Sequence, residues 1–462
     1  MLPDPSRTTL GPDPIHRRCA INGYAFQQDA LHTYNGWQYA CFYASSTDNE
    51  EPLYVHLSRR KLQYGEWETI VFKDYAQTTD DGHNTVQLGI CPGDGTIHLS
   101  YDHHCDVLRY RHSLPGVASS PDDHDWTPKL FTDTLSSLPG LSSPDTTDLL
   151  SYITYPRFVA RGQDLLFTFR TGKAGLGDDH LCVYTASANE GESDIRTYTL
   201  LGTHLKGVQN NPYIHSLSVC PVSQDLVTTW VYRDFVHYEG WDDPLDTKHK
   251  AQAGPNGAEN NHDICYASSP NGGLTWLNAK GETIADLRNG ESILPSSKGV
   301  TVWNVEKGKG LINQESQAVD QDGACHVLNR DCVDGEMRWR HYHLDAGGTA
   351  TSRPLPFVEG VYGGKRGQVA VAKNGDLFFV LPHHAKPELS ILRARKENGY
   401  KDYALVWRGE EFPPCEPLVD KVRLERDDVL SVFTKVASTK REGGVDLVVL
   451  DFRLCAELCG TY

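Results

Sequence analysis

The stretch NGDLFFVLP at residues 374–382 sets an Asn-Gly turn immediately before a short apolar strand. Asn tolerates a left-handed backbone and Gly adopts a positive φ freely, as a tight hairpin between twisted strands requires. The same combination, Asn or Asp, usually with Gly, before an alternating or apolar run, occurs seven times. The copies are Asn35-Gly36 before WQYACFYA, Asp94-Gly95 before TIHLSYD, Asp164 before LLFTFR, Asp225 before LVTTWVYRD, Asp322-Gly323 before ACHVLNRD, Asn374-Gly375 before DLFFVLP, and Asp427-Asp428 before VLSVFTKV.

Seven hairpin units of this kind predict a repeat architecture. Short strand units bury their faces only against neighbouring units, and radial repetition around an axis leaves few exposed edges. No long stretch keeps the apolar spacing of an amphipathic helix. The sequence therefore predicts an all-β fold, a seven-bladed β-propeller of four-stranded antiparallel blades, as a single domain over residues 1–462. We expect the two chain ends to meet in one blade, with Trp37–Ala44 and Leu447–Phe452 as the strands at those ends.

The interval between the fourth and fifth turns is the longest, and it contains the polar stretch 240–263. This stretch is rich in Gly, Asn and Asp and has no periodicity, which predicts an inserted loop on one rim. Directly after it, residues 269–276 spell SPNGGLTW. They resemble the Asp-box, Ser-x-Asp-x-Gly-x-Thr-Trp, with Asn in place of the Asp. The box is a folded hairpin that supports a turn, so it indicates the fold and not the function.

The composition of the 462-residue chain restricts what it binds. Hydrophobic residues make up 39%, and 61 Asp and Glu against 44 Lys and Arg give a net charge of −17. No cationic face is implied that would hold phosphates, so nucleic acid is not expected as a partner. No apolar run approaches the roughly 20 residues of a membrane span, so no membrane partner is expected. The start MLPDPSRTTLGPDP lacks the features of a signal peptide, and the twelve cysteines include no CxxC pair.

The densest polar constellation is DDGHN at residues 80–84, followed by the histidine pair His103-His104. His83 and His103 are expected on neighbouring strands of one blade. Further along the chain, Arg170 falls at the end of the predicted strand LLFTFR, where a side chain is well placed for a site. Tyrosines stand beside prolines at Tyr155-Pro156 and Pro212-Tyr213. The structural alternative for such a tyrosine is packing against the next blade with its hydroxyl bound to backbone.

Taken in order, these residues resemble the BNR-repeat polysaccharide lyases that are built on seven-bladed propellers. The family includes ulvan lyases and the L-rhamnose-α-1,4-D-glucuronate lyases that act on gum arabic side chains. The resemblance covers roughly residues 25–450. It rests on Asn35-Gly36-Trp37-Gln38-Tyr39, His83-Asn84, Gly95-x-x-His98, His103-His104, Tyr155-Pro156, Arg170-x-Gly172, the Asp-box, and Asn313-Gln314-Glu315-Ser316.

The resemblance implies a site of two histidines, a tyrosine, an arginine and a second tyrosine. On this chain these look like His83, His103 or the adjacent His104, Tyr155, Arg170 and Tyr213, with Tyr152 as a rival to Tyr155. Two further candidates for substrate binding are Arg157 and Gln38.

The implied reaction is β-elimination from a 4-linked uronate. The proton on C5, next to the carboxylate, is removed and the group on O4 is expelled, leaving a 4,5-unsaturated sugar. Arg170 suits the carboxylate because it is permanently charged and can bind it through two hydrogen bonds. In glucuronate the C5 hydrogen and O4 lie on one face, so one residue can serve both. Tyr155, its pKa lowered by a nearby arginine, is expected to be base and acid, with His103 as the competing base and His83 as the partner of the carboxylate or O4.

The expected substrate is an acidic polysaccharide with rhamnose joined to O4 of glucuronate. An L-rhamnose-α-1,4-D-glucuronate lyase is the first expectation and an ulvan lyase the alternative. Such polymers are extracellular, which favours secretion, and a monomer is expected. No cofactor is needed for elimination. Relatives among ulvan lyases carry a structural metal, which leaves a calcium or zinc ion open near Cys325, His326, His341 and His343.

Two other classes of protein stay open. A sialidase-like glycoside hydrolase would need three arginines on the substrate carboxylate and a Tyr/Glu pair, and no such arginine triad can be placed on matching repeats. A non-catalytic carbohydrate-binding propeller would use exposed Trp and Tyr to stack on sugars.

Overall fold

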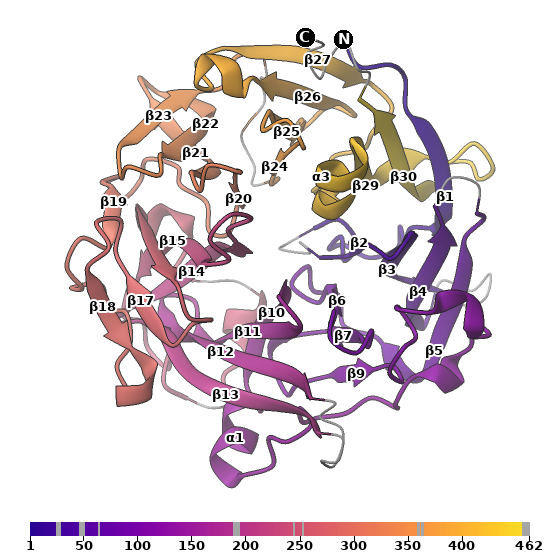
Figure 1. The fold of residues 1–462 in the computed structure, drawn as a ribbon, viewed down its shortest axis with the longest axis horizontal. Helices are drawn as coiled ribbons and strands as arrows, with labels where there is room; N and C mark the ends of the chain where they lie inside the picture. The colour runs from indigo at the N-terminus through magenta and orange to yellow at the C-terminus, as the bar shows by residue number, and fades with distance from the viewer. Residues whose placement is uncertain are drawn as a thin grey trace.

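Seven antiparallel sheets surround a central axis in the computed structural model (Figure 1). It describes residues 1–24, 29–45, 51–62, 65–187, 195–243, 245–251, 254–357, 361 and 365–454. The predicted seven-bladed β-propeller is confirmed. Four blades have four strands, and the other three have three, five and six strands. Short strands such as β8, which pairs with β10, account for the larger sheets. Among the described helices, none is both long and apolar enough to cross a membrane.

We number the blades in chain order. Blade 1 contains β2 (Leu31–Tyr34), β3 (Trp37–Ser45), β4 (Leu53–Lys61) and β5 (Glu68–Gln77); blade 2 contains β6 (Val86–Ile90), β7 (Ile97–Tyr101) and β9 (Tyr110–His112). Blade 3 contains β8 (His104–Asp106), β10 (Ile153–Arg161), β11 (Asp164–Lys173), β12 (Leu176–Ser187) and β13 (Ile195–Lys206). Blade 4 contains β14 (Asn210–Val219), β15 (Leu226–Asp234), β16 (Asn261–Ser269), β17 (Thr275–Leu277), β18 (Thr283–Asp286) and β19 (Thr301–Trp303).

Blade 5 contains β20 (Ser316–Val319), β21 (Cys325–Val333), β22 (Glu336–Leu344) and β23 (Ala350–Pro354). Blade 6 contains β24 (Gln368–Val371), β25 (Leu377–Pro382), β26 (Leu389–Ala394) and β27 (Tyr403–Gly409), and blade 7 contains β28 (Leu418–Val419), β29 (Val429–Ala437), β30 (Val445–Arg453) and β1 (Ser6–Pro12). The α-helices are α1 (Pro144–Leu149), α2 (Lys248–Ala251) and α3 (Lys421–Asp427), and the 3-10 turns are Pro121–Asp123, Pro128–Leu130, Ala258–Asn260, Leu287–Asn289 and Lys396–Asn398.

The seven predicted turns occupy equivalent positions. Each lies at the start of the strand that follows it, β3, β7, β11, β15, β21, β25 or β29. The seventh is not a hairpin turn, because Asp427 ends helix α3 and Asp428 caps it between β28 and β29. At the first of them Asn35 has φ 45° and Gly36 has φ 78°, the left-handed backbone that a two-residue hairpin needs. The Asp-box forms the turn between β16 and β17, where Asn271 accepts a hydrogen bond from the Thr275 amide at 2.8 Å. Its Trp276 is fully buried.

The ring closes in blade 7 by pairing of strands from the two ends of the chain (Figure 1). Strand β1 lies antiparallel to β30, with Ser6 opposite Asp451. The expectation that Leu447–Phe452 belongs to the closing blade is correct, but Trp37–Ala44 is not its partner, because those residues form β3 of blade 1. The true partner carries Gly11 and Pro12 and few apolar residues, so its sequence gives a weak strand signal.

A buried polar network joins blade 7 to blade 1. Asp451 accepts hydrogen bonds from Arg60 Nη2 at 2.7 Å and from Arg423 Nη1 at 2.7 Å. Gln38 donates from Nε2 to Asp420 Oδ2 at 2.8 Å and accepts from Arg60. Gln38, predicted to bind substrate, is therefore fully buried in this seam.

Asp451→Asn should lower the free energy of unfolding by about 3–5 kcal/mol, because it leaves two buried guanidinium groups without their counter-charge. Urea or thermal unfolding measures the change. Asp122→Asn is the matched control, since the Lys61–Asp122 pair is well exposed, and it should leave unfolding almost unchanged. Equal stability of the Asp451→Asn variant and the parent would contradict this role of the seam.

Candidate functional site

The predicted site residues come from the ends of the inner strands that lie away from the seven turns. Tyr155 stands near the start of β10 and Tyr213 near the start of β14, whereas Arg170 stands near the end of β11. The register of blade 3 places Thr154 opposite Arg170, so these ends share one face of the ring. Four of the residues predicted from the sequence therefore meet here, His83 being the fourth.

Asp81 holds two imidazole rings together. Its Oδ1 lies 2.6 Å from His83 Nδ1 and its Oδ2 lies 2.6 Å from His104 Nδ1. Burial opposes ionisation of the Asp81 carboxyl, but the hydrogen bonds from His104 and His83 outweigh burial and hold its pKa well below the usual range. The ionised carboxylate accepts from both Nδ1 atoms, so Nε2 is the nitrogen of each ring that the carboxylate does not bind.

The two imidazole rings are stacked, with centroids 3.8 Å apart and an angle of 16° between their planes. His104 is the deeper ring, with 10% of its side chain exposed against 33% for His83. Burial, assisted by the neighbouring His83, lowers the pKa of His104 to about 4. His104 is therefore neutral near pH 7, and His83 is the ring that solvent or substrate can reach.

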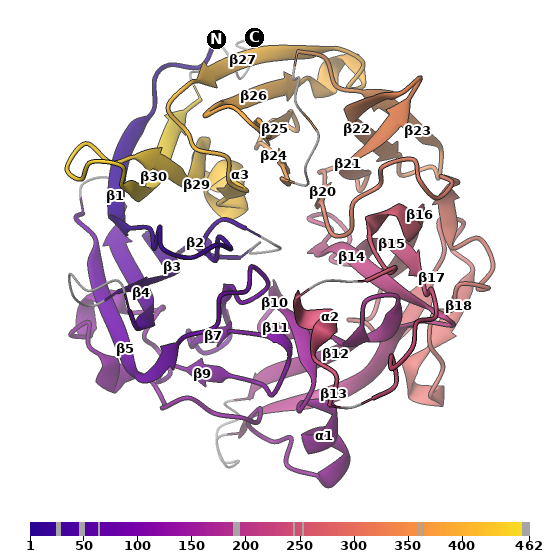
Figure 2. The same ribbon diagram turned by 180° about the vertical axis from the view of Figure 1, so that it is seen from behind.

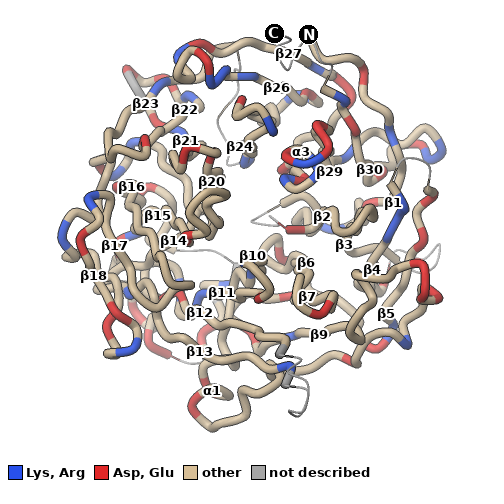
Figure 3. The backbone as a smooth tube through the Cα atoms, viewed as in Figure 1, with Lys and Arg blue, Asp and Glu red and all other residues tan. Residues whose placement is uncertain are grey.

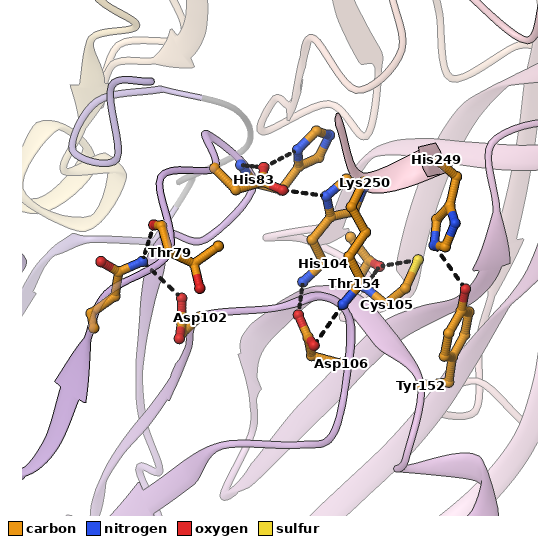
Figure 4. Close-up of polar contacts among 12 residues, drawn as sticks. Thr79, His83, Asp102, His104, Cys105, Asp106, Tyr152, Thr154, His249 and Lys250 are labelled. Carbon is orange, nitrogen blue, oxygen red and sulfur yellow. Dashed lines mark hydrogen bonds and ion pairs between the residues drawn. The ribbon is translucent and has the colours of Figure 1, made fainter. Parts of the chain in front are cut away.

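Chain crossing between blades explains why His104, and not His103, joins this pair. Strand β8 begins at His104 and leaves blade 2 to pair with β10, which places His104 opposite Thr154 (Figure 4). His103 stays behind in blade 2, almost completely buried. Its Nε2 accepts a hydrogen bond from the Arg109 amide at 2.8 Å, and burial keeps its pKa well below the ordinary value. In this structure His103 supports a turn.

Tyr155 leaves the regular strand pattern at a bulge. The pairing of β10 with β11 shifts between Thr154 and Arg157, and Tyr155 has φ 57°. A non-glycine residue in this left-handed region costs about 1–3 kcal/mol, which the surrounding packing must offset. The bulge aims the Tyr155 ring towards His83, with centroids 5.7 Å apart, and towards Tyr213, with centroids 6.3 Å apart.

Arg170 lies against both tyrosine rings. Its Cζ is 5.6 Å from the centroid of Tyr155 and 5.2 Å from that of Tyr213. Its Nη2 donates to the carbonyl of Gly172 at 2.7 Å, but Nε is buried and has no acceptor within the described residues. Such an orphaned donor in a native site calls for a missing partner, and a planar guanidinium is suited to a carboxylate.

The pKa of Tyr155 differs from the sequence-based expectation. Burial, assisted by the neighbouring Tyr213, raises this pKa, and the opposing effect of Arg170, Arg233 and Arg366 is smaller. The expected lowering by an arginine is thus outweighed by desolvation. Tyr155 is a protonated phenol in the free protein, which makes it a proton donor before it can act as a base.

The predicted inserted loop reaches the site. It forms the connection between β15 and β16, and β16 begins at Asn261, before the predicted end of the loop. Two residues of its helix α2 contact blade 3 (Figure 4): His249 Nε2 lies 2.9 Å from the Tyr152 hydroxyl, and Lys250 Nζ lies 2.7 Å from Asp106 Oδ1. The sequence predicted neither contact. Asp81 was also missed as a site residue, although it stands two positions before His83.

Arg157 lies apart from this group of residues. Its guanidinium donates to the carbonyls of His215 and Ile214, at 3.2 and 3.1 Å. It lines a central cavity of about 320 Å³ that also includes Asp29 and Lys421. The guanidinium of Arg157 is therefore bound to backbone carbonyls of blade 4, and Gln38 lies in the seam between blades 7 and 1.

The four residues considered for a structural metal do not form one ligand set. Neighbours in a strand point to opposite faces, so Cys325 packs in the apolar core beside Val327 while His326 faces the other way. His326 Nδ1 lies 2.9 Å from His341 Nε2, and His341 Nδ1 lies 2.9 Å from the Tyr403 hydroxyl. Asp81, His83 and His104 do offer ligand atoms within 4.8 Å of one another, but their Nδ1 and carboxylate atoms already bind each other.

Residues 37–356 match the family described as BNR repeat-containing family member. The chain belongs to this BNR repeat-containing family. Ulvan lyase, long isoform, of Pseudoalteromonas sp. (strain PLSV) is 24% identical over 335 residues, 65% of this chain and 31% of that protein. Ulvan lyase, short isoform, of Alteromonas sp. (strain LOR) is 26% identical over 191 residues, 34% of this chain and 35% of that protein. The BNR-repeat chain thus matches about a third of the length of these curated relatives.

A solved structure supports the fold of this BNR-repeat chain. The crystal structure of polysaccharide lyase Uly1 superposes with a TM-score of 0.69 at 18% identity, and the superposition covers 97% of this chain and 98% of that one. At this identity the likeness shows a shared propeller fold. What the residues of this BNR-repeat chain do follows from their own geometry.

His104 should stay neutral down to about pH 4, because burial lowers its pKa. An unfolded histidine binds a proton near pH 6.5, so the free energy of unfolding should be highest above that pH and fall by at most about 3 kcal/mol towards pH 4. Imidazole NMR signals and urea unfolding at several pH values measure both effects. His104→Gln should lose this share of the pH dependence. Titration of His104 near pH 6.5 would contradict the stacked, buried pair.

Proposed function

We propose that this chain is a polysaccharide lyase that cleaves the bond between a rhamnose and O4 of glucuronate by β-elimination. The observation that carries the proposal is the meeting of Arg170, Tyr155 and the histidine pair bound to Asp81 on one face of the ring. A carboxylate-binding cation, a proton donor and a proton acceptor are the three groups that elimination from a uronate requires.

Arg170 is proposed to bind the uronate carboxylate. The C5 proton is barely acidic while that carboxylate carries its full charge, so a cation must stabilise the enolate-like charge that develops during its removal. Arg170 has a buried Nε that finds no acceptor in the part of the chain that the structure describes, and its guanidinium lies against two tyrosine rings that limit its motion. Tyr213 is proposed to position this guanidinium and the sugar.

His83 and Tyr155 are proposed to share the two proton transfers. Asp81 keeps Nε2 of His83 available as the acceptor of the C5 proton. The electrons of the C5–H bond then form the C4–C5 double bond, and the C4–O4 bond breaks. Tyr155, whose pKa burial raises, donates its proton to the leaving O4 and recovers one from His83. In glucuronate the C5 hydrogen and O4 lie on the same face, so neighbouring side chains can serve both atoms.

Ulvan is the polymer that we propose as substrate. The support is that curated relatives of this chain are named ulvan lyases. The L-rhamnose-α-1,4-D-glucuronate lyase expected first from the sequence would break the same kind of bond in another polymer, and no contact of the described residues favours it. Such polymers lie outside cells, and we propose that the protein acts there.

A sialidase-like hydrolase is less well supported by the arginine contacts. Arg233 donates three hydrogen bonds: from Nε to Asn261 Oδ1 at 2.8 Å, from Nη1 to the carbonyl of Asn256 at 3.3 Å, and from Nη2 to Asn313 Oδ1 at 2.7 Å. Arg366 donates to the carbonyl of Asn313 at 3.1 Å and to Glu416 at 2.7 Å. Both guanidinium groups therefore have protein partners where a substrate carboxylate would have to bind.

Tyr155→Phe should lower kcat on ulvan at least about 100-fold while substrate binding changes little, because it removes the donated proton and keeps the ring. Ultraviolet absorbance of the 4,5-unsaturated product measures turnover, and calorimetry measures binding. Tyr152→Phe is the matched control, since the Tyr152 hydroxyl faces His249, and it should retain most of the activity.

Two results would contradict this assignment. Near-normal kcat in Tyr155→Phe would show that another group donates the proton. Failure of the parent chain to form any unsaturated product from rhamnose–glucuronate polymers would contradict the lyase itself and favour a hydrolase or a carbohydrate-binding propeller.

A further inference from the structure

The connection between β15 and β16 lies beside the site. Figure 2 shows α2 on the near face, next to β10 and β12. In addition to the contacts of His249 and Lys250, Lys173 Nζ donates to the carbonyls of Trp241 at 2.8 Å and Asp243 at 3.4 Å. Lys173 follows Arg170 by three positions on β11. These contacts fix the connection to the strand that supplies the carboxylate-binding arginine.

The first part of this connection carries a group of partly exposed aromatic rings. The centroid of Phe235 lies 5.2 Å from that of Trp241 and 6.4 Å from that of Tyr238. None of the three is buried. Rings of this kind offer flat apolar faces on which the C–H groups of a sugar can pack, and a Trp offers the largest. None of the three rings belongs to the buried core clusters of the described residues.

Cationic groups lie between the aromatic rings and the histidine pair. The ring of His249 lies 6.3 Å from that of His104. Burial lowers the pKa of His249, and the charges of Lys173 and Lys250 lower it further, against the raising effect of Asp246. Lys250 is neutralised by Asp106, whereas Lys173 donates to two uncharged carbonyls. The acidic residues Glu239, Asp242, Asp243 and Glu259 of the connection are exposed, whereas Asp246 is partly buried and its charge acts on His249 and Tyr238.

We infer that Trp241 and Lys173 form a second sugar-binding position, next to the one at which the bond is cleaved. Trp241 would pack on the ring of the neighbouring sugar, and Lys173 would bind an anionic substituent on it, a carboxylate or a sulfate. The inference rests on the proposed function, because it assigns the next sugar of the same acidic polymer. Oligosaccharides that reach both positions then bind more tightly than those that fill only one.

The test compares two ligand lengths in a chain that cannot turn them over. In the Tyr155→Phe background, calorimetry measures the binding of an ulvan disaccharide and an ulvan tetrasaccharide. Trp241→Ala and Lys173→Ala should each weaken tetrasaccharide binding about tenfold and change disaccharide binding less than about twofold. Trp241→Phe, which keeps a ring, should retain most of the affinity.

Matched controls remove the same groups elsewhere. Phe357→Ala removes a ring that is 57% exposed on another part of the surface, and Lys280→Ala removes an exposed lysine from the outer part of blade 4. Both should bind the two ligands like the parent. Unchanged tetrasaccharide binding in Trp241→Ala, an equal loss for both lengths, or no binding of either length would overturn the second position.

The outcomes separate this inference from the lyase. Length-dependent binding that needs Trp241, together with no unsaturated product from the parent chain, would uphold the second position and refute the lyase. An active lyase that binds both ligand lengths equally well with and without Trp241 would uphold the lyase and refute the second position.

Discussion

Pairing of β1 with β30 is the constraint on which the rest of the structure depends. A propeller blade covers its faces only with its neighbours, so an open ring would leave the apolar faces of two blades in water. Here the N-terminal strand completes the C-terminal blade, and Asp451 draws Arg60 and Arg423 into the seam between blades 7 and 1. Closure fixes the spacing of all seven inner strands around the axis.

The candidate site uses that fixed spacing. His83 comes from the connection into blade 2, Tyr155 and Arg170 from blade 3, and Tyr213 from blade 4, so no single blade contains the site. The net charge of −17 does not describe the local charge at the site. Acidic and basic residues are spread around the ring (Figure 3), and among the described residues Arg170 donates to the carbonyl of Gly172 and forms no ion pair with a carboxylate. An acidic protein can therefore present a cationic position to an acidic polymer.

Local chemistry made the fold predictable from the sequence. Most of the turns have a left-handed Asn or Gly in or beside the Asn/Asp signal, and seven such signals along the chain indicate a propeller. The closing strand was not predictable in this way, because β1 is defined by its distant partner and not by its own residues. The family resemblance named Tyr155, Arg170, Tyr213 and His83, and the structure brings these four residues together.

Long-range pairing and burial decided the rest. The choice between His103 and His104 depends on β8 crossing from blade 2 to blade 3, which neighbouring residues do not encode. Gln38 was predicted to bind substrate, but in the fold its side chain lies in the seam between blades 7 and 1 and donates a hydrogen bond to Asp420. The raised pKa of Tyr155 follows from burial, which no spacing of residues reveals.

The most direct test of the central claim follows the oxygen atoms of the reaction. Ulvan is treated with the protein in water enriched in heavy oxygen, and mass spectrometry measures the products at the newly formed ends. Elimination adds no water, so the account predicts unsaturated ends without heavy oxygen. Saturated glucuronate ends, together with one heavy oxygen on the new reducing end for each bond cleaved, would show hydrolysis and would contradict the account.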